Sequence, residues 1–253
     1  MAYRIVLDAG HGGRDAGASY MGRLEKDDAL NLALAVGQIL ENAGVDVEYT
    51  RTTDVYNTPF EKATMGNNAN ADLFVSIHRN ATEIPGGSTG IETLVYDDSG
   101  IKSEIARNIN ENLEGLGFVN RGVIERPNLV VLKRTKMPAL LVEAGFIDNP
   151  ADNEKFDTMF NEVAQAIADG ILDSIDMGDL LETPRYKVQV GAYDDPDTAN
   201  ALSMRLVAAG YPAYVTASNG MYKVRVGNYS NLGEAVAMEN RLRSDGYPTF
   251  IIT

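Results

Sequence analysis

The sequence predicts an α/β protein with a largely parallel, twisted sheet and helices on both faces, followed by a small α+β domain. The first observation is that strand-like and helix-like segments alternate along roughly the first 175 residues. The second is an internal repeat near the C-terminus. The third is the composition, because 253 residues of which 44% are hydrophobic suffice for one large core or two smaller ones.

The elements of the first part follow from the spacing of apolar residues. An apolar run predicts a strand over residues 3–8, and Leu32, Val36 and Ile39 share one face of a helix predicted over residues 29–40. Further strands are predicted at five short apolar runs: residues 45–50, 72–77, 90–95, 129–132 and 139–142. A last helix is predicted from apolar residues at helical spacing: Phe156, Phe160, Val163, Ile167 and Ile171.

The C-terminal part contains two related units. YKVQVGAY begins at Tyr186 and YKVRVGNY at Tyr222, and six of their eight positions are identical at an offset of 36 residues. Each unit predicts a strand, an Ala- and Leu-rich helix that ends at Gly, and a short strand that opens with Tyr-Pro. Because two units are too few for a solenoid, we expect one compact split-βαβ fold made from two half repeats of 36 residues.

A polar segment with Gly and Pro predicts a linker over residues 177–184, between domains at residues 1–176 and 185–253. The charge changes at the same place. From Arg185 onward there are seven Lys and Arg against six Asp and Glu, and before it 15 against 30. The first domain is therefore strongly acidic and the second nearly neutral.

Composition excludes several classes of protein. The net charge of −14 argues against a nucleic-acid partner, since such proteins neutralise phosphates with a basic surface. No Cys is present, which excludes disulfides, thiolate nucleophiles and Cys-ligated zinc. No apolar stretch approaches the roughly 20 residues of a membrane span, so we expect no membrane insertion. The first residues, MAYRIVLDAGHGG, predict a strand rather than a secretory signal.

Both histidines of the chain, His11 and His78, directly follow apolar strands. Because strand ends of a parallel sheet meet at one edge, the two imidazoles are candidate metal ligands. A hydrolytic zinc site often takes two His and one Glu and leaves a position open for water. Glu25, at the entrance to the first predicted helix, is the candidate third ligand. Glu143, which ends the last predicted strand, is a candidate general base.

Each of these residues also has a structural interpretation. Histidines at strand ends are commonly structural or surface residues. A glutamate near a helix start is favoured by the helix dipole, and Glu143 could pair with a nearby Arg or Lys. The residues alone leave both interpretations open.

Three separated segments carry a family resemblance. They are DAGHGG at 8–13 with DAGA at 15–18 and Glu25, ADLFVSIHRN at 71–80, and MPALLVEAGF at 137–146. In this order, over roughly residues 1–175, they resemble the zinc-dependent N-acetylmuramoyl-L-alanine amidases of the amidase-3 type. The resemblance implies one Zn²⁺ held by His11, Glu25 and His78, with Glu143 as the catalytic carboxylate.

The C-terminal repeat is similar to a SPOR domain, which implies binding to peptidoglycan glycan strands that lack stem peptides. Strand alternation places Gln189, Lys223 and Arg225 on the polar sheet face, and also Tyr193 and Tyr229 if no bulge follows the glycines. We expect these five residues to contact glycan.

Asn80 and Arg79 are expected to contact the muramic acid that bears a stem peptide. The sequence departs from the family at Arg79, where a small residue is usual, and at Lys62, near a position where the family often has Arg.

The expected activity is zinc-dependent hydrolysis of the amide between N-acetylmuramic acid and L-alanine in peptidoglycan. A zinc peptidase that cuts within the stem peptide and a catalytically silent wall-binding protein are the alternatives. The two-domain arrangement resembles sporulation mother-cell autolysins and some phage endolysins, and the sequence does not decide between them. For either, we expect synthesis in the cytoplasm and action on the wall after lysis or holin-type release.

Overall fold

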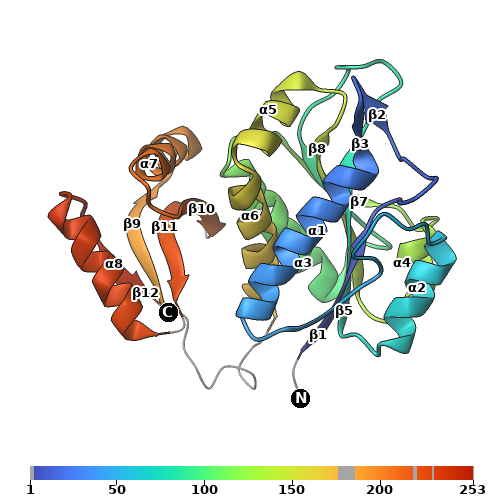
Figure 1. The fold of residues 1–253 in the computed structure, drawn as a ribbon, viewed down its shortest axis with the longest axis horizontal. Coiled ribbons are helices and arrows are strands. Elements are labelled where there is room, and N and C mark those ends of the chain that lie inside the picture. The colour runs from blue at the N-terminus through green and yellow to red at the C-terminus, as the bar shows by residue number, and fades with distance from the viewer. Residues whose placement is uncertain (1–2, 176–185, 219–220, 230, 253) are drawn as a thin grey trace.

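The computed structural model describes residues 3–175, 186–218, 221–229 and 231–252. It consists of a larger α/β domain and a smaller α+β domain, which lie side by side (Figure 1). The predicted linker over residues 177–184 lies outside the described residues. The predicted class, a mostly parallel sheet between helices with a small α+β domain, is confirmed.

The larger domain is centred on a six-stranded sheet in the order β4-β1-β5-β8-β6-β7. All neighbouring strands are parallel except β6, which runs antiparallel to β8. The strands are β1 (Arg4–Ala9), β4 (Asp46–Tyr49), β5 (Leu73–Asn80), β6 (Ile91–Val95), β7 (Asn120–Glu125) and β8 (Ala139–Phe146). A short hairpin, β2 (Ser19–Tyr20) and β3 (Arg23–Leu24), precedes the first helix. The carboxyl ends of β1, β5 and β8 therefore meet at one edge.

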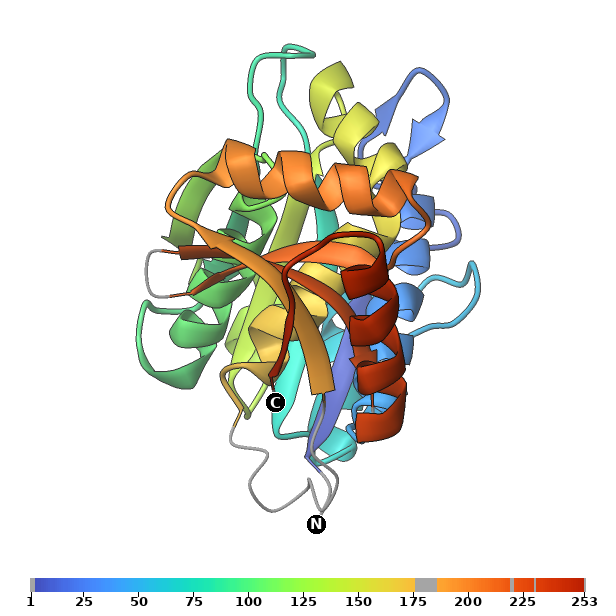
Figure 2. The ribbon, with the colours of Figure 1, turned by 90° about the vertical axis from the view of Figure 1, so that its left-hand side faces the viewer.

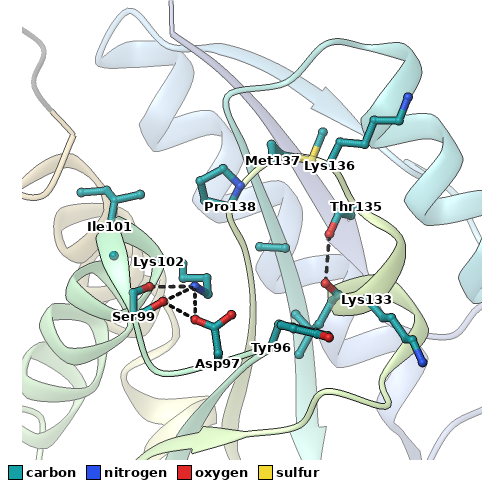
Figure 3. A pocket seen from close by; sticks show the side chains of 13 residues that line it. Tyr96, Asp97, Ser99, Ile101, Lys102, Lys133, Thr135, Lys136, Met137 and Pro138 are labelled. Atoms are coloured by element: carbon teal, nitrogen blue, oxygen red, sulfur yellow. Dashed lines mark hydrogen bonds and ion pairs between the residues drawn. The ribbon is translucent and has the colours of Figure 1, made fainter.

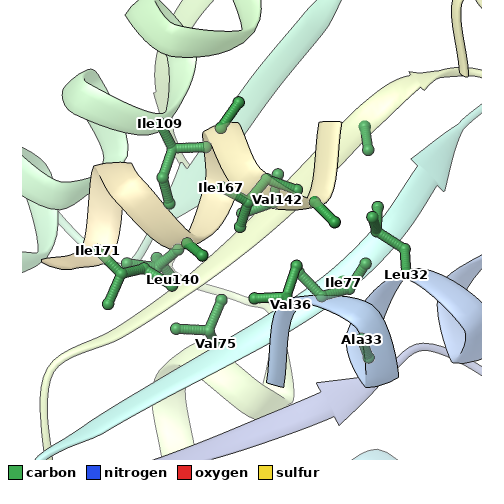
Figure 4. Packing of buried hydrophobic residues seen from close by; sticks show 14 of the residues in the cluster. Leu32, Ala33, Val36, Val75, Ile77, Ile109, Leu140, Val142, Ile167 and Ile171 are labelled. Atoms are coloured by element: carbon green, nitrogen blue, oxygen red, sulfur yellow. The ribbon is translucent and has the colours of Figure 1, made fainter. Parts of the chain in front are cut away.

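Helices cover both faces of this sheet. One face packs against α1 (Glu25–Asn42), α3 (Gly100–Glu114) and α6 (Phe160–Leu172), and the other against α2 (Pro59–Asn68) and α4 (Val130–Arg134). A fifth helix, α5 (Pro150–Thr158), follows β8. Figure 4 shows the larger core, where Leu32 and Val36 of α1 and Ile167 of α6 meet strand residues such as Val75 and Val142. The helical spacing of these apolar residues thus directs one face of each helix to the sheet.

Two expectations about elements are wrong. The predicted strand over residues 129–132 is not a strand, because residues 130–132 belong to α4 and Leu129 is the N-cap of that helix. A four-residue apolar run has no periodicity that separates a strand from a buried helix turn. The predicted last helix is two helices, because the backbone of Met159 between α5 and α6 departs from helical geometry, with ψ of 32°.

The smaller domain has an antiparallel sheet in the order β10-β11-β9-β12. Its strands are β9 (Tyr186–Tyr193), β10 (Ala213–Ser218), β11 (Met221–Tyr229) and β12 (Phe250–Ile252), with helices α7 (Pro196–Ala208) and α8 (Leu232–Ser244). Asp195 and Asn231 cap the two helices at corresponding positions. Valines at alternate strand positions, Val188, Val190, Val224 and Val226, are buried in its core.

The two domains are in contact through β10, which lies against α3 and α6 (Figure 1). The backbone N–H of Ala217 donates to Oδ1 of Asn112 at 2.9 Å. Helix α8 lies on the side of the small sheet away from the larger domain (Figures 1 and 2). Helix α7 packs on the same sheet and lines a cavity together with Gly117, Lys155 and Met159 of the larger domain. The charge of Arg225 on the polar sheet face acts on the carboxyl group of Asp169 in α6, so this face is turned toward α6. No helix among the described residues is long and apolar enough to cross a membrane.

Candidate active site

The fold brings the three predicted metal ligands together at the carboxyl edge of the sheet. His11 follows β1, Glu25 is the first residue of α1, and His78 lies near the end of β5. Their ligand atoms all lie within 4.8 Å of one another. Nε2 of His11 is 3.1 Å from Oε2 of Glu25, and Nδ1 of His78 is 2.8 Å from Oε1 of the same carboxylate. Two imidazole nitrogens and one carboxylate are a donor set suited to a divalent transition metal.

Glycines allow this close approach. A Cβ added to Gly10 would lie 2.5 Å from Cε1 of His78, and one added to Gly17 would lie 2.6 Å from Oε2 of Glu25. Gly17 also has φ of +67°, and His11 itself has φ of +57°. Because positive φ is costly for residues with a side chain, the loop depends on glycine next to the ligands.

Further contacts orient the ligands. Oδ2 of Asp15 is 3.0 Å from Nδ1 of His11, so the other ring nitrogen of His11 remains available for a metal ion. Glu25 accepts hydrogen bonds from the backbone N–H groups of Ala18 and Arg79. Burial by itself raises the pKa of Glu25, but its contacts with His11 and His78 outweigh burial and hold that pKa well below its usual value. Glu25 is therefore ionised, as a ligand must be.

Glu143 lies beside this group on β8. It is opposite His78 in the β5–β8 pairing and opposite Glu92 in the β8–β6 pairing. Its Oε2 is buried and has no hydrogen-bond partner among the described residues. Burial raises the pKa of Glu143 to about 7, with the charges of Glu25 and Glu92 adding to the effect and the histidines opposing it. A carboxyl group with this pKa can both accept and return a proton near neutral pH.

A buried ion pair supports the loop that carries His11. Asp8 is bonded to Nζ of Lys62 at 2.9 Å and to the hydroxyl groups of Thr50 and Ser76, both at 2.6 Å. Nζ of Lys62 also donates to the carbonyl oxygen of Ala9. Lys62, one of the two departures from the family pattern, is thus part of the support beneath the site and not of its surface.

The expectation that Arg79 contacts substrate is wrong. Its side chain points into the protein and the residue is only 2% exposed. The guanidinium donates to Asp28 and Asn153, both at 2.7 Å, and stacks on the ring of Phe156 at 4.0 Å. Arg79 therefore joins α1, β5 and α5. Asn80 lies at the edge of the sheet, where its amide donates to Oε1 of Glu92 at 3.0 Å.

The predicted glycan contacts of the smaller domain lie in two different environments. Gln189 and Arg225 are each 8% exposed. Asp169 of α6 is buried near them, since the charge of Arg225 acts on its carboxyl group. Lys223 is partly buried.

Tyr193 and Tyr229 do not lie on that polar face. The β9–β11 pairing shifts register between Val224 and Arg225 and again between Val226 and Tyr229, which interrupts the alternation. Both rings pack against the core of the smaller domain, over Gly191 and Gly227. The expectation that these tyrosines share the face of Gln189 is wrong for this reason.

A separate cavity of about 500 Å³ opens at the opposite end of the sheet (Figure 3). It lies where β8 begins, at Met137 and Pro138, and Lys102 is bonded there to Asp97. Because His11, Glu25 and His78 lie at the carboxyl edge, this cavity is not part of the candidate metal centre.

A mostly parallel α/β sheet that carries a His-Glu-His group and a buried carboxylate at one edge defines a metallohydrolase-like domain. Residues 5–173 match the family model described as N-acetylmuramoyl-L-alanine amidase, and residues 182–253 match the SPOR domain. The chain therefore belongs to the N-acetylmuramoyl-L-alanine amidase family and carries a SPOR cell-wall-binding domain.

Individual relatives agree with this assignment. The chain is 35% identical to the sporulation-specific N-acetylmuramoyl-L-alanine amidase of Bacillus subtilis over 84% of each chain. It is 38% identical to an endolysin of Bacillus phage SPP1, over 70% of this chain and 68% of that one. The crystal structure of an N-acetylmuramoyl-L-alanine amidase from Clostridium difficile 630 superposes with a TM-score of 0.64 at 32% identity, covering 68% of this chain and 96% of that one.

The sequence analysis missed three supporting groups. Asp15 stands four residues after His11, a spacing that could have identified it as a partner of that ring. No local pattern indicates Glu92 or Arg121, because only the sheet order places Glu92 beside Glu143 and Arg121 beside Glu92.

Proposed function

We propose that this amidase cuts the amide between the lactyl group of N-acetylmuramic acid and L-alanine, with Zn²⁺ held by His11, Glu25 and His78. The observation that carries the proposal is the gathering of three ligand atoms within 4.8 Å beside a carboxyl group that has an unpartnered oxygen. When bound, Zn²⁺ polarises a carbonyl group and lowers the pKa of water toward ~7.

Glu143 supplies the proton transfers. Its position next to His78 in the sheet places the carboxylate beside the ligands, where it takes the proton of the attacking water and returns it to the alanine nitrogen as the C–N bond breaks. Burial makes this carboxylate a stronger base than an exposed glutamate, which favours uptake of the water proton.

The test is digestion of purified sacculi with and without a chelator, with the new end groups identified. We expect free N-terminal alanine without new reducing sugar ends, loss of release on chelation, and recovery with zinc. Other amino termini would indicate a peptidase acting within the stem peptide. Binding to sacculi without any release would indicate a silent wall-binding protein.

Variants separate the roles of the residues. Glu143→Gln should retain bound zinc and the fold but lose at least a hundredfold in turnover, whereas His78→Ala should lose zinc. Glu104→Gln, a change at an exposed glutamate of α3, is the matched control and should change neither quantity. Turnover of Glu143→Gln close to that of the parent protein contradicts the catalytic role.

For the SPOR domain, we propose that the polar sheet face binds glycan strands that lack stem peptides. Gln189 and Arg225 support this proposal, because they pair directly across β9 and β11 and offer adjacent donors to sugar hydroxyl groups. Since Asp169 of α6 is buried against this face, glycan binding there requires the two domains to separate.

Binding of the full chain to sacculi tests the glycan site. The double variant Gln189→Ala/Arg225→Ala should bind denuded glycan at least tenfold more weakly. Arg205→Ala, a change at an exposed arginine of α7 on the other side of the sheet, is the control. Equal binding by the double variant and the control would place the glycan site elsewhere.

A further inference from the structure

A row of polar side chains crosses the same edge of the sheet that carries the metal ligands. His78 pairs with Glu143 in the β5–β8 ladder, Glu143 pairs with Glu92 in the β8–β6 ladder, and Oε2 of Glu92 is 3.1 Å from Nε of Arg121 on β7. Successive strands thus present His, Glu, Glu and Arg. The row leads from the candidate metal centre to a cation.

Arg121 is fixed in place but remains accessible. Its guanidinium donates to Glu92, lies within 3.5 Å of the carbonyl oxygen of Thr89, and sits over the ring of Phe146 at 5.3 Å. Glu92 is itself held by the amide of Asn80. The side chain of Arg121 is 39% exposed, against 13% for Glu92. A guanidinium held on one side in this way keeps outward N–H groups for a ligand.

Arg79, the other arginine near this edge, is not accessible, because it is enclosed by Asp28, Asn153 and Phe156. Arg121 is the one of the two that a substrate can reach. Arg121 is a local positive charge in the acidic part of the chain, since the residues before Arg185 include 30 acidic and 15 basic ones.

Distance along the row identifies the part of the substrate that Arg121 meets. Neighbouring strands lie about 4.8 Å apart, so β7 is roughly 10 Å from β8 and Glu143. An extended peptide spans about 3.3 Å per residue, and this distance corresponds to two or three residues. In the substrate proposed above, the lactyl carboxyl group is consumed in the amide and the sugars are neutral. Its anionic groups are carboxylates of the stem peptide.

We propose that Arg121 binds a free carboxylate of the stem peptide, two or three residues from the scissile amide on the amine side. Arg121 is then a specificity-determining residue that favours acidic stem peptides over amidated ones. This inference rests on the proposed amidase function, because it places the scissile amide at Glu143.

Three synthetic N-acetylmuramoyl peptides test the proposal: one with free carboxylates, one amidated at the second peptide residue and one amidated at the third. For the parent protein, amidation at the recognised position should lower kcat/KM about ten- to a hundredfold, the range for one hydrogen bond between charged groups. Arg121→Gln should lose a similar factor on the acidic peptide. On the peptide amidated at the recognised position, it should match the parent protein within about twofold.

Arg126→Gln is the matched control, since Arg126 is an exposed arginine just beyond the other end of β7 and should leave the selectivity unchanged. Glu92→Gln, which removes the anchor of Arg121, should reduce the selectivity without abolishing it. Equal losses on all three peptides for Arg121→Gln would overturn the inference while leaving the amidase function intact. Failure of the parent protein to release N-terminal alanine from any peptide would contradict both.

Discussion

Lys62 and Asp8 form an ion pair whose removal should destabilise the larger domain strongly. Their side chains are 4% and 1% exposed, and Nζ lies 2.9 Å from Oδ1. Lys62→Met keeps the aliphatic volume but leaves a buried carboxylate with only the Thr50 and Ser76 hydroxyl groups. Breaking one side of a buried pair costs about 3–5 kcal/mol.

The expected change in melting temperature follows from the size of the domain. For 150–250 residues, 1 kcal/mol corresponds to roughly 2–4 °C, so Lys62→Met should lower Tm by roughly 6–20 °C in a calorimetric scan. Lys102→Met is the control, because Lys102 pairs with an Asp97 side chain that is 49% exposed, and such a pair contributes about 1 kcal/mol or less.

A double-mutant cycle checks the cause. Asp8→Asn/Lys62→Met removes both charges, so it should be more stable than Lys62→Met alone, since no unpaired buried charge remains. A fall in Tm of less than about 2 °C for Lys62→Met would refute the reasoning. A fall in stability of the double variant that exceeds the sum of the falls in the two single variants would also refute the reasoning.

Three further outcomes are expected. Although burial by itself raises the pKa of Asp8, Lys62 and the hydroxyl groups hold that pKa below its usual value. The free energy of unfolding should therefore fall as the pH drops below about 4. Chemical denaturation at pH 5 and pH 3 should show a smaller fall for Asp8→Asn/Lys62→Met than for the parent protein. Arg79→Met should cost about 1–3 kcal/mol by removing hydrogen bonds to Asp28 and Asn153, since Asp28 keeps its ion pair with Arg23. An increase in KM with unchanged Tm would contradict the structural role. Gly17→Ala should weaken zinc binding about tenfold or more, since its Cβ would press on Glu25, whereas Gly22→Ala, also at positive φ but with nothing within 4 Å, should not.

Much of the candidate site follows from local sequence. His11, His78 and Glu143 each come at or near the end of an apolar strand, and strands of a parallel sheet bring such ends together. Glu25 was placed at a helix start, and the structure has it as the first residue of α1. The gathering of His11, Glu25 and His78 within 4.8 Å was therefore predictable from the order of the elements.

Other expectations failed where the answer depends on packing. Residues 130–132 form part of a helix that buries Val131 and Leu132, which a run of four apolar residues does not reveal. Bulges place Tyr193 and Tyr229 on the sheet face opposite to the one that strand alternation predicts. One added residue moves every later side chain of a strand to the other face.

The sequence by itself determined the fold class, the two-part organisation and the residues around which a metal site could form, because periodicity and strand-end position are local properties. Only the tertiary structure decided that Arg79 is enclosed while Arg121 is accessible, and that Gln189 and Arg225 face α6. Burial depends on which distant elements pack over a side chain. Arg79 is covered by Phe156 and Asn153, more than 70 positions further along the chain.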